Sequence, residues 1–327
     1  MNSQPNDASL RFRRAPAHCR AESLWLLWSR ESPETRRDWL TSVLLRGAER
    51  TESLRGLLEA RRAKQLVGAA WAEVLPGHMA NVWPPRLIDN EDACTADGLL
   101  KWLDHFLHRE QVHLAQALPS PGCLRDAEVL ERNGFSKAAD LLYLVWCRGT
   151  PIPRVHTASS DDTASGSRLG GFVVEPYSPA SRRRLALIIE QTYIETLDIP
   201  AMNGLRSIDD VLDGYCLSIA DENRHWFILT NQDEDVGCLL LADHALYDQV
   251  ELVYMGIVPK FRGRRWGERV ARFAQDRASE TLGRNRLVLA VDAQNSPAIS
   301  LYFRLGFSEW DRREVYLRSY AAVQRLL

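Results

Sequence analysis

The stretch Asn295-Ser-Pro-Ala298-Ile-Ser-Leu-Tyr302-Phe-Arg-Leu-Gly306-Phe307 decides the fold prediction for this chain. The residues just before it, 286–291, alternate around apolar side chains and predict a strand. Within the stretch, Ala298, Tyr302 and Gly306 recur every four residues, which is about one helix turn. The pattern N-x-x-A-x-x-x-Y-x-x-x-G-F therefore predicts a short helix at 297–304 that follows a strand.

A second motif, Arg262-Gly263-Arg264-Arg265-Trp266-Gly267, follows the apolar run 249–258 and precedes a predicted helix at 267–282. A loop that leads into a helix presents unpaired N–H groups and the positive end of the helix dipole to an anion. Its arginines add donors that suit phosphate oxygens. The loop predicts a diphosphate site, although taken alone it equally fits a glycine-containing turn with exposed arginines.

The two motifs together, in this order, resemble the cofactor motifs of the GNAT acyltransferase superfamily. The second half of the chain also has the element order of that family: strand, two helices, three strands, helix, strand, helix, strand. The ranges expected for the first six are 171–176, 179–197, 208–219, 225–230, 236–242 and 249–258. The resemblance implies an α/β fold, a mixed twisted sheet with helices on both faces, and acetyl-CoA (coenzyme A) as co-substrate.

The same resemblance implies which residues contact the cofactor. They are Ile257, Val258, Arg262, Gly263, Arg264, Arg265, Trp266, Gly267, Asn295 and Ala298. The strand 251–258 is expected to splay from its neighbour, so that N–H groups near Met255, Ile257 and Val258 are free for the acyl carbonyl and the pantetheine arm. Asn295 is expected to bind that arm or to cap the short helix. One departure is Arg265, which stands where the family usually has glycine and where a side chain can block close approach of the backbone.

Acyl transfer from a thioester to an amine needs a neutral amine and a proton for the departing thiolate. Tyr302 occupies the family's tyrosine position and is the candidate acid. Glu251 lies eleven residues before Arg262, as the base does in histone-type members, and burial in an apolar strand would raise its pKa. It equally fits an outward-facing charge on a strand, and Asp292 is a reserve candidate. The N–H of Met255 is expected to stabilise the oxyanion.

The acceptor is expected to contact the loop 195–204, between the first two helices of the second half, although this loop also fits a plain helix connection. The sequence leaves several acceptors open: a polyamine, an antibiotic or a protein N-terminus. An amino-sugar thiol conjugate is a fourth, because the tandem architecture is similar to that of the mycothiol synthases.

A chain of 327 residues predicts two domains. Residues 149–170, rich in Pro, Ser, Asp and Gly, are the expected linker between domains at 1–148 and 171–327. The first half echoes the second, with expected strands within 63–74, a helix at 96–110 and a strand at 112–118. Leu130-Glu-Arg-Asn-Gly134-Phe135 aligns with Tyr302 to Phe307, but it lacks the tyrosine, and no glycine-rich loop follows the strand expected at 80–83. The first half therefore resembles a degenerate GNAT-like domain.

Composition narrows the function classes. The chain has 41 Lys and Arg against 43 Asp and Glu, a formal charge of −2, so neither nucleic acid nor an anionic membrane is an expected partner. Its six cysteines are scattered without a C-x-x-C pair, which is typical of a reducing cytosol. No membrane span or signal peptide is visible, and the protein is expected to be cytoplasmic. His105 and His108 on one helix fit a solvated face better than a metal site, and no metal is expected.

The sequence thus predicts an N-acetyltransferase that moves an acetyl group from acetyl-CoA to a small-molecule or peptide amine by direct attack in a ternary complex. The alternative is a non-catalytic acyl-CoA-binding or protein-interaction module that has kept a GNAT fold. Acceptor, acyl chain, any ligand of the first half and oligomeric state are left open.

Overall fold

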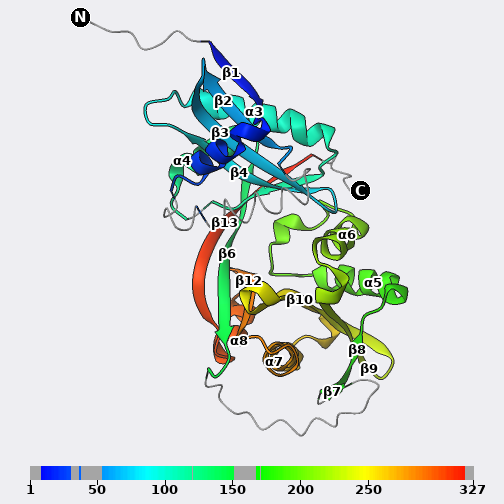
Figure 1. Ribbon diagram of the computed structural model, residues 1–327. Helices are drawn as coiled ribbons and strands as arrows, with labels where there is room; N and C mark the ends of the chain where they lie inside the picture. The colour runs from blue at the N-terminus through cyan, green and yellow to red at the C-terminus, as the bar shows by residue number, and fades with distance from the viewer. Residues whose placement is uncertain are drawn as a thin grey trace, which may run out of the picture. The chain divides into compact units, whose positions relative to one another are not determined.

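The computed structural model describes residues 9–30, 37, 54–119, 121–150, 167–169 and 171–320. The chain forms two compact units, Met1–Ala138 together with Glu314–Leu327, and Ala139–Arg313. We call them unit 1 and unit 2. Each is a mixed sheet with helices on both faces, as the sequence predicts (Figure 1).

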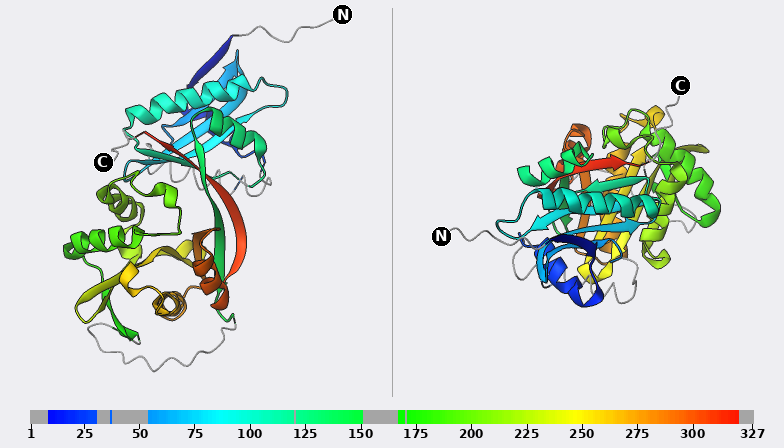
Figure 2. Two further views of the ribbon diagram at one scale, coloured as in Figure 1. Left: turned by 180° about the vertical axis from the view of Figure 1, so that it is seen from behind. Right: turned by 90° about the horizontal axis from the view of Figure 1, so that it is seen from above.

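Unit 1 has the strand order β1-β2-β3-β4-β5-β13, in which only β4 and β5 run parallel. Its strands are β1 (Leu10–Arg14), β2 (Leu57–Arg62), β3 (Gln65–Leu75), β4 (Met79–Leu87), β5 (Leu114–Ala117) and the end of β13 (Ser308–Ser319). Its helices are α1 (Arg20–Leu27), α3 (Cys94–Arg109) and α4 (Leu124–Arg132). The apolar face of α3 covers one side of the sheet (long cyan helix, Figure 2), while α1 packs with Leu57 and Trp71 on the other.

Unit 2 has the strand order β13-β6-β12-β11-β10-β9-β8-β7, to which β13 contributes its first half; among the strand pairs from β6 to β7, only β11 and β12 run parallel. Its strands are β6 (Ser136–Cys147), β7 (Ser167–Leu169), β8 (Phe172–Pro176), β9 (Arg224–Asn231), β10 (Glu234–His244), β11 (Gln249–Ile257) and β12 (Arg286–Asp292). Its helices are α5 (Arg182–Tyr193), α6 (Ile208–Ser218), α7 (Trp266–Asp276) and α8 (Ser296–Arg304). Figure 1 shows α5 and α6 on one face of this sheet and α7 on the other.

Each unit is completed by a strand from the other half of the sequence. β6 crosses into unit 2 at Ala139 and pairs with β12, with Leu144 opposite Leu289. β13 crosses into unit 1 at Glu314 and pairs with β5, with Leu317 opposite Gln116. The compact units therefore differ from the segments 1–148 and 171–327, because a strand's side-chain pattern does not say which sheet it joins. The expected linker contains β7, and its residues 151–166 and 170 lie outside the described residues.

The internal repeat is visible in the backbone. In both halves a glycine is the second residue after the helix, Gly134 after α4 and Gly306 after α8. The two glycines have the same φ, +83°. The following phenylalanine N–H then donates to a carbonyl five residues back, Phe135 to Leu130 at 3.1 Å and Phe307 to Tyr302 at 3.1 Å. This is the helix ending that a left-handed glycine permits.

The core of unit 2 holds α7 in place behind the loop 262–265. Val270, Ala271 and Ala274 are fully buried against the sheet, because they lie on one face of the helix. The helix predicted to run to residue 282 changes to π-helical geometry over Arg277–Thr281 and ends before Gly283, whose φ is +68°. Among the helices described, none combines the length and the apolar character that a bilayer crossing requires.

Candidate active site

The parallel strands β11 and β12 part from each other within unit 2. Their register runs only from Gln249 opposite Arg286 to Glu251 opposite Val288, although β11 continues to Ile257 and β12 to Asp292. A β-bulge at Val253 breaks the register of β11 with β10 at the same level. Because a bulge bends its strand, it turns the last residues of β11 away from β12. The splay expected from the sequence is present.

The alternation of β11 decides which of its N–H groups face this opening. The N–H of Val258 donates to Val236 O at 2.9 Å, so Val258 faces β10 and its N–H is not free, unlike the expectation. Gly256, two residues back, also faces β10. Met255 and Ile257 therefore direct their N–H groups to the opposite edge, where the opening lies. Of the three N–H groups expected to be free, those of Met255 and Ile257 face the opening between β11 and β12, and that of Val258 does not.

The side chain of Arg262 binds backbone carbonyls of the protein instead of extending into solvent, where a ligand would be. Its guanidinium donates to three carbonyl oxygens: Ile257 at 3.0 Å, Thr192 at 2.9 Å and Glu195 at 3.4 Å. Two of these acceptors lie at the C-terminal end of α5, where the helix dipole favours a positive charge. The side chain of Arg262 therefore fixes the end of β11 against α5.

The loop before α7 leaves that helix open at its N-terminus. Gly263 has φ +77°, and the N-cap residue Arg265 has φ 58° and ψ 18°, in the left-handed region. The side chain of Arg265 makes no capping hydrogen bond, so the first N–H groups of α7 keep no side-chain acceptor from the cap. Together with the dipole, this is a suitable cradle for a diphosphate.

The other loop side chains divide between packing and exposure. Trp266 is buried and stacks on Phe261, with ring centroids 5.1 Å apart. The guanidinium carbon of Arg264 lies 5.2 Å from the Phe261 ring centre and 5.6 Å from that of Trp266. Arg265 is exposed and has no recorded side-chain partner among the described residues. Gly267 faces Leu301 of α8, where an added Cβ would lie 3.4 Å from Cδ1.

The left-handed backbone at Arg265 predicts a gain in stability for Arg265→Gly. A non-glycine residue in this region costs about 1–2 kcal/mol, and the added freedom of glycine in the unfolded chain offsets part of the relief. We expect the free energy of unfolding to rise by about 0.5–1 kcal/mol in urea denaturation. Arg264→Gly, which has no strain to relieve and loses its ring contacts, should lower it. Equal effects of the two substitutions would contradict this account.

Tyr302 and Asn295 lie on α8 beside the opening. Tyr302 is 5% exposed and contacts Phe307 edge to face, with ring centroids 5.3 Å apart. Burial raises the pKa of Tyr302, and the negative charge of Asp198 adds to the rise, so the phenol keeps its proton. Asn295 Oδ1 accepts from the N–H of Ala298 at 3.3 Å, so Asn295 caps the helix.

Glu251 projects from β11 just before the strands part. Its carboxylate lies 2.9 Å from Nε2 of His244, and both side chains are partly exposed. The hydrogen bond that His244 donates to the carboxylate of Glu251 raises the pKa of His244. Glu251 is therefore a solvent-reached carboxylate with a histidine partner, rather than one sealed in an apolar strand.

A reciprocal pair of hydrogen bonds, which sequence reasoning missed, joins the loop after α5 to the end of β12. The N–H of Asp292 donates to Asp198 Oδ1 at 2.9 Å, and the N–H of Ile199 donates to Asp292 Oδ2 at 3.1 Å. We call this the Asp198–Asp292 clasp. Asp292 is 2% exposed. Loss of hydration raises the pKa of Asp198, and the charge of Asp292 adds to the rise.

A strained residue follows Asp198 in this clasp. Ile199 has φ 41° and ψ 64°, which is costly for a β-branched residue. Strain of this kind persists only where surrounding contacts hold it, and it concentrates at functional sites. The sequence Asp198-Ile199-Pro200 indicates a turn, because Asp and Pro favour turns. It does not indicate contact with Asp292, which lies 94 positions away from Asp198.

A cavity of about 300 Å³ opens between this loop, α5, α6 and β11. It is lined by Glu190, Tyr193, Thr196, Asp198, Ile199, Met202, Asn203, Gly204, Arg206, Ile208, Val211, Tyr215, Val253 and Tyr254. The bulge residue Val253 belongs to its wall, so the cavity adjoins the splayed part of β11. We call it the loop cavity. Part of its lining comes from the loop 195–204, for which the sequence left open an acceptor site or a plain helix connection.

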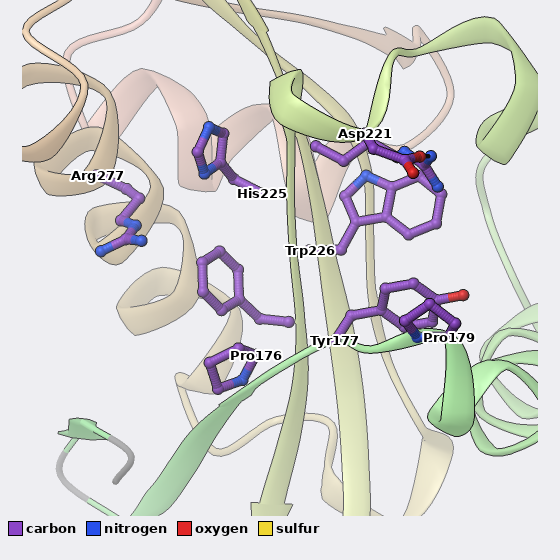
Figure 3. Close-up of a pocket in the computed structure, with 9 residues that line it drawn as sticks. Pro176, Tyr177, Pro179, Asp221, His225, Trp226 and Arg277 are labelled. Carbon is purple, nitrogen blue, oxygen red and sulfur yellow. Dashed lines mark ion pairs between the residues drawn. The ribbon is translucent and has the colours of Figure 1, made fainter. Parts of the chain in front are cut away.

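A second hollow, of about 290 Å³, lies at the start of β9 (Figure 3). Figure 3 shows Tyr177 and Trp226 on one side of the strand and His225 and Arg277 on the other. Neighbouring residues of a strand point to opposite faces, so these groups do not converge on one ligand. The hollow is separate from the opening beside β11.

Unit 1 has a similarly short parallel pairing, and an ion pair joins its strand β4 to its helix α4. β4 and β5 stay in register only from Met79 to Asn81, as β11 and β12 do. Arg86 of β4 then forms a two-pronged ion pair with Asp126 of α4, at 2.8 and 2.9 Å. Asp126 is the third residue of α4, as Ala298 is the third of α8. In addition, Asp92 Oδ1 accepts the N–H of Cys94 at 2.9 Å, which places a carboxylate at the start of α3.

The comparison with known families agrees with this geometry. Residues 192–307 match the model of the acetyltransferase (GNAT) family. This part of the chain is similar to that family in sequence. The matched residues include the whole opening, from the end of α5 to Phe307.

Solved structures show the same fold over nearly the full chain. A GCN5-related N-acetyltransferase from Sphaerobacter thermophilus aligns with a TM-score of 0.59 at 14% identity, covering 95% of both chains. A tandem GNAT protein from the clavulanic acid biosynthesis pathway, solved without AcCoA, aligns with a TM-score of 0.52 at 12% identity, covering 96% of this chain and 99% of that one. The chain thus folds as two tandem GNAT-like domains.

Curated relatives match over a shorter stretch. Mycothiol acetyltransferases from Pseudarthrobacter chlorophenolicus and from Arthrobacter sp. FB24 are each 36% identical, over 66 and 70 residues. The match spans 20% of this chain and 20% of each relative.

Proposed function

We propose that unit 2 transfers an acetyl group from acetyl-CoA to a primary amine. The observation that carries the proposal is the N-terminus of α7, where the N-cap residue Arg265 provides no side-chain cap, and which a short loop joins to a strand that parts from its parallel neighbour. The helix start supplies N–H donors for the diphosphate, and the opening supplies the N–H groups of Met255 and Ile257 for the pantetheine arm and the acyl carbonyl. GNAT enzymes generally use acetyl-CoA, and the family match covers these elements.

The reaction proceeds by direct attack. Glu251 accepts one proton from the ammonium of the acceptor, directly or through water, which leaves a neutral amine. The amine nitrogen attacks the thioester carbon, and the N–H of Met255 stabilises the oxyanion. As the C–S bond breaks, Tyr302 gives its proton to the thiolate and regains one from the new amide nitrogen. The products are the acetylated amine, free coenzyme A and one proton.

In this proposal unit 1 makes no acetyl transfer of its own. The buried carboxylate of Asp126 and the carboxylate of Asp92 stand where an anionic cofactor would need donors. The ion pair between Arg86 and Asp126 joins β4 to α4. A structural or substrate-shaping role for the degenerate domain follows.

Glu251→Gln is expected to lower kcat/KM most at the acidic end of the working pH range, by about 10²-fold or more. There the acceptor is almost fully protonated and needs a base, whereas near the pKa of the free amine the neutral form is already present and the deficit should shrink. The measurement is a pH–rate profile of thiol release for both proteins. A profile unchanged by the substitution would move the base to another residue.

A second candidate is a binding module that holds acyl-CoA without turnover. Arg265 favours it, because the family's usual glycine lets the backbone approach the ligand closely. Calorimetry with acetyl-CoA separates the candidates when it is paired with a thiol-release assay over glucosamine, L-cysteine, spermidine and a short peptide. Binding with release by at least one amine supports the enzyme. Binding without release by any amine supports the module, and absence of binding removes both.

A further inference from the structure

The loop cavity carries charges of both signs on its walls. Glu190 and Asp198 contribute carboxylates, and Arg206 contributes a guanidinium. The remaining polar groups include the hydroxyls of Tyr193, Tyr215 and Tyr254. A wall of this composition offers a partner to each group of a ligand that carries both charges, whereas a ligand with only one sign of charge leaves at least one wall group without a counter-charge.

The negative group is held in a fixed position. Asp198 accepts a hydrogen bond from the N–H of Asp292 at 2.9 Å. The N–H of the next residue, the strained Ile199, donates to the Asp292 carboxylate at 3.1 Å. One oxygen of the Asp198 carboxylate, Oδ2, has no recorded hydrogen bond among the described residues and remains for a ligand. The charge of Asp198 also acts on Tyr302, the proposed acid.

The positive group is unpaired. Arg206 is half-buried, and within the described part of the chain its guanidinium has no recorded ion pair or hydrogen bond. Burial raises the pKa of Tyr193 to about 12, and the positive charge of Arg206 acts in the opposite direction, as it does on Tyr215. Arg206 therefore lies near the tyrosines of the wall. A partly buried, unpaired guanidinium gains from a planar anionic ligand.

We propose that the loop cavity binds an acceptor that bears both an amine and an acidic group, with the ammonium at Asp198 and the acid at Arg206. This inference rests on the acetyl transfer proposed above and narrows its acceptor. A volume of about 300 Å³ limits the acceptor to a small molecule of amino-acid size. Asp292 of β12 acts on Asp198 through its charge and its N–H, and the charge of Asp198 acts in turn on Tyr302 of α8, Tyr193 of α5 and Tyr254 of β11. Arg206 lines the same cavity.

Matched acceptor pairs that differ by one carboxylate test this inference. The probes are L-serine with ethanolamine, L-lysine with cadaverine, and L-histidine with histamine, each at saturating acetyl-CoA. We expect the carboxylate-bearing member of at least one pair to be preferred by about 10- to 100-fold in kcat/KM, the value of a charged hydrogen bond. Arg206→Gln should remove the preference through KM with kcat nearly unchanged. Arg183→Gln, the same charge change on the exposed face of α5, should keep it.

Asp198→Asn tests the proposed contact between the Asp198 carboxylate and the ammonium of the acceptor. Asparagine still accepts the N–H of Asp292, so the clasp is kept, but the charge for the ammonium is lost. KM should rise about tenfold for both members of a pair, and the calorimetric Kd for acetyl-CoA should not change. Equal use of both members, a preference for the decarboxylated amine, or a preference that survives Arg206→Gln overturns the inference. Acetyl-CoA binding without acetylation of any of these probes also overturns it, whereas absence of acetyl-CoA binding overturns the proposed function itself.

Discussion

Tyr302→Phe is expected to lower kcat for acetyl transfer by about 10²- to 10⁴-fold, the usual contribution of a general acid. The thiolate leaving group needs a proton as the C–S bond breaks, and Tyr302 is the phenol that α8 presents beside the opening. Burial raises its pKa, so the proton is present throughout the neutral range. The assay is thiol release at saturating acetyl-CoA and acceptor.

The stability of the variant provides the control. The Tyr302 hydroxyl has no recorded hydrogen bond to another described residue, and the ring contact with Phe307 does not need it. The free energy of unfolding and the Kd for acetyl-CoA should therefore stay close to their original values. A fully active Tyr302→Phe protein would mean that solvent, not this phenol, protonates the thiolate.

Ala298→Asp is expected to weaken acetyl-CoA binding by roughly 100-fold or more, because it places a carboxylate beside an anionic ligand. The substitution copies unit 1, where Asp126 holds the same place in α4. It should not harm the fold, since an acidic residue in the first turn of a helix is favourable. Calorimetry with acetyl-CoA gives the Kd.

Ala298→Ser serves as the matched control, since serine adds a polar group without a charge. Its Kd should lie within a few-fold of the original. If Ala298→Asp binds acetyl-CoA as tightly as Ala298→Ser does, then α8 does not border the cofactor and the assignment of the opening is incorrect.

The sequence predicted the elements of unit 2 well because its signals are local. Gly263 and Gly306 adopt the left-handed backbone that their own turns require, and glycine at these positions marks the turns in the sequence. The apolar residues of α7 recur at helical spacing, which marks the helix. The repeat in unit 1 was visible for the same reason, through Gly134 and Phe135. The destination of β6 and β13 was not predictable. The side-chain pattern of each strand says that it is partly buried but not which strand it pairs with, and that choice depends on β12 and β5, far away in sequence.

The site was predicted in part. The splay of β11 and the outward N–H groups of Met255 and Ile257 followed from the motif, whereas the commitment of Arg262 to three carbonyls did not. Whether an arginine contacts a ligand or a backbone carbonyl depends on which segments of the fold lie near its guanidinium. The carbonyls at the end of α5 lie about seventy positions away in sequence, so the sequence does not reveal them. The Asp198–Asp292 clasp was missed for the same reason. Glu251 remains a proposed base, now with a histidine partner at 2.9 Å.

The most direct test of the account is a calorimetric titration of the 327-residue chain with acetyl-CoA. The account predicts a single site per chain, lost in Ala298→Asp and kept in Asp126→Asn, because only the opening of unit 2 is free to receive the cofactor. No binding at all, or a site that Ala298→Asp leaves intact, would contradict it.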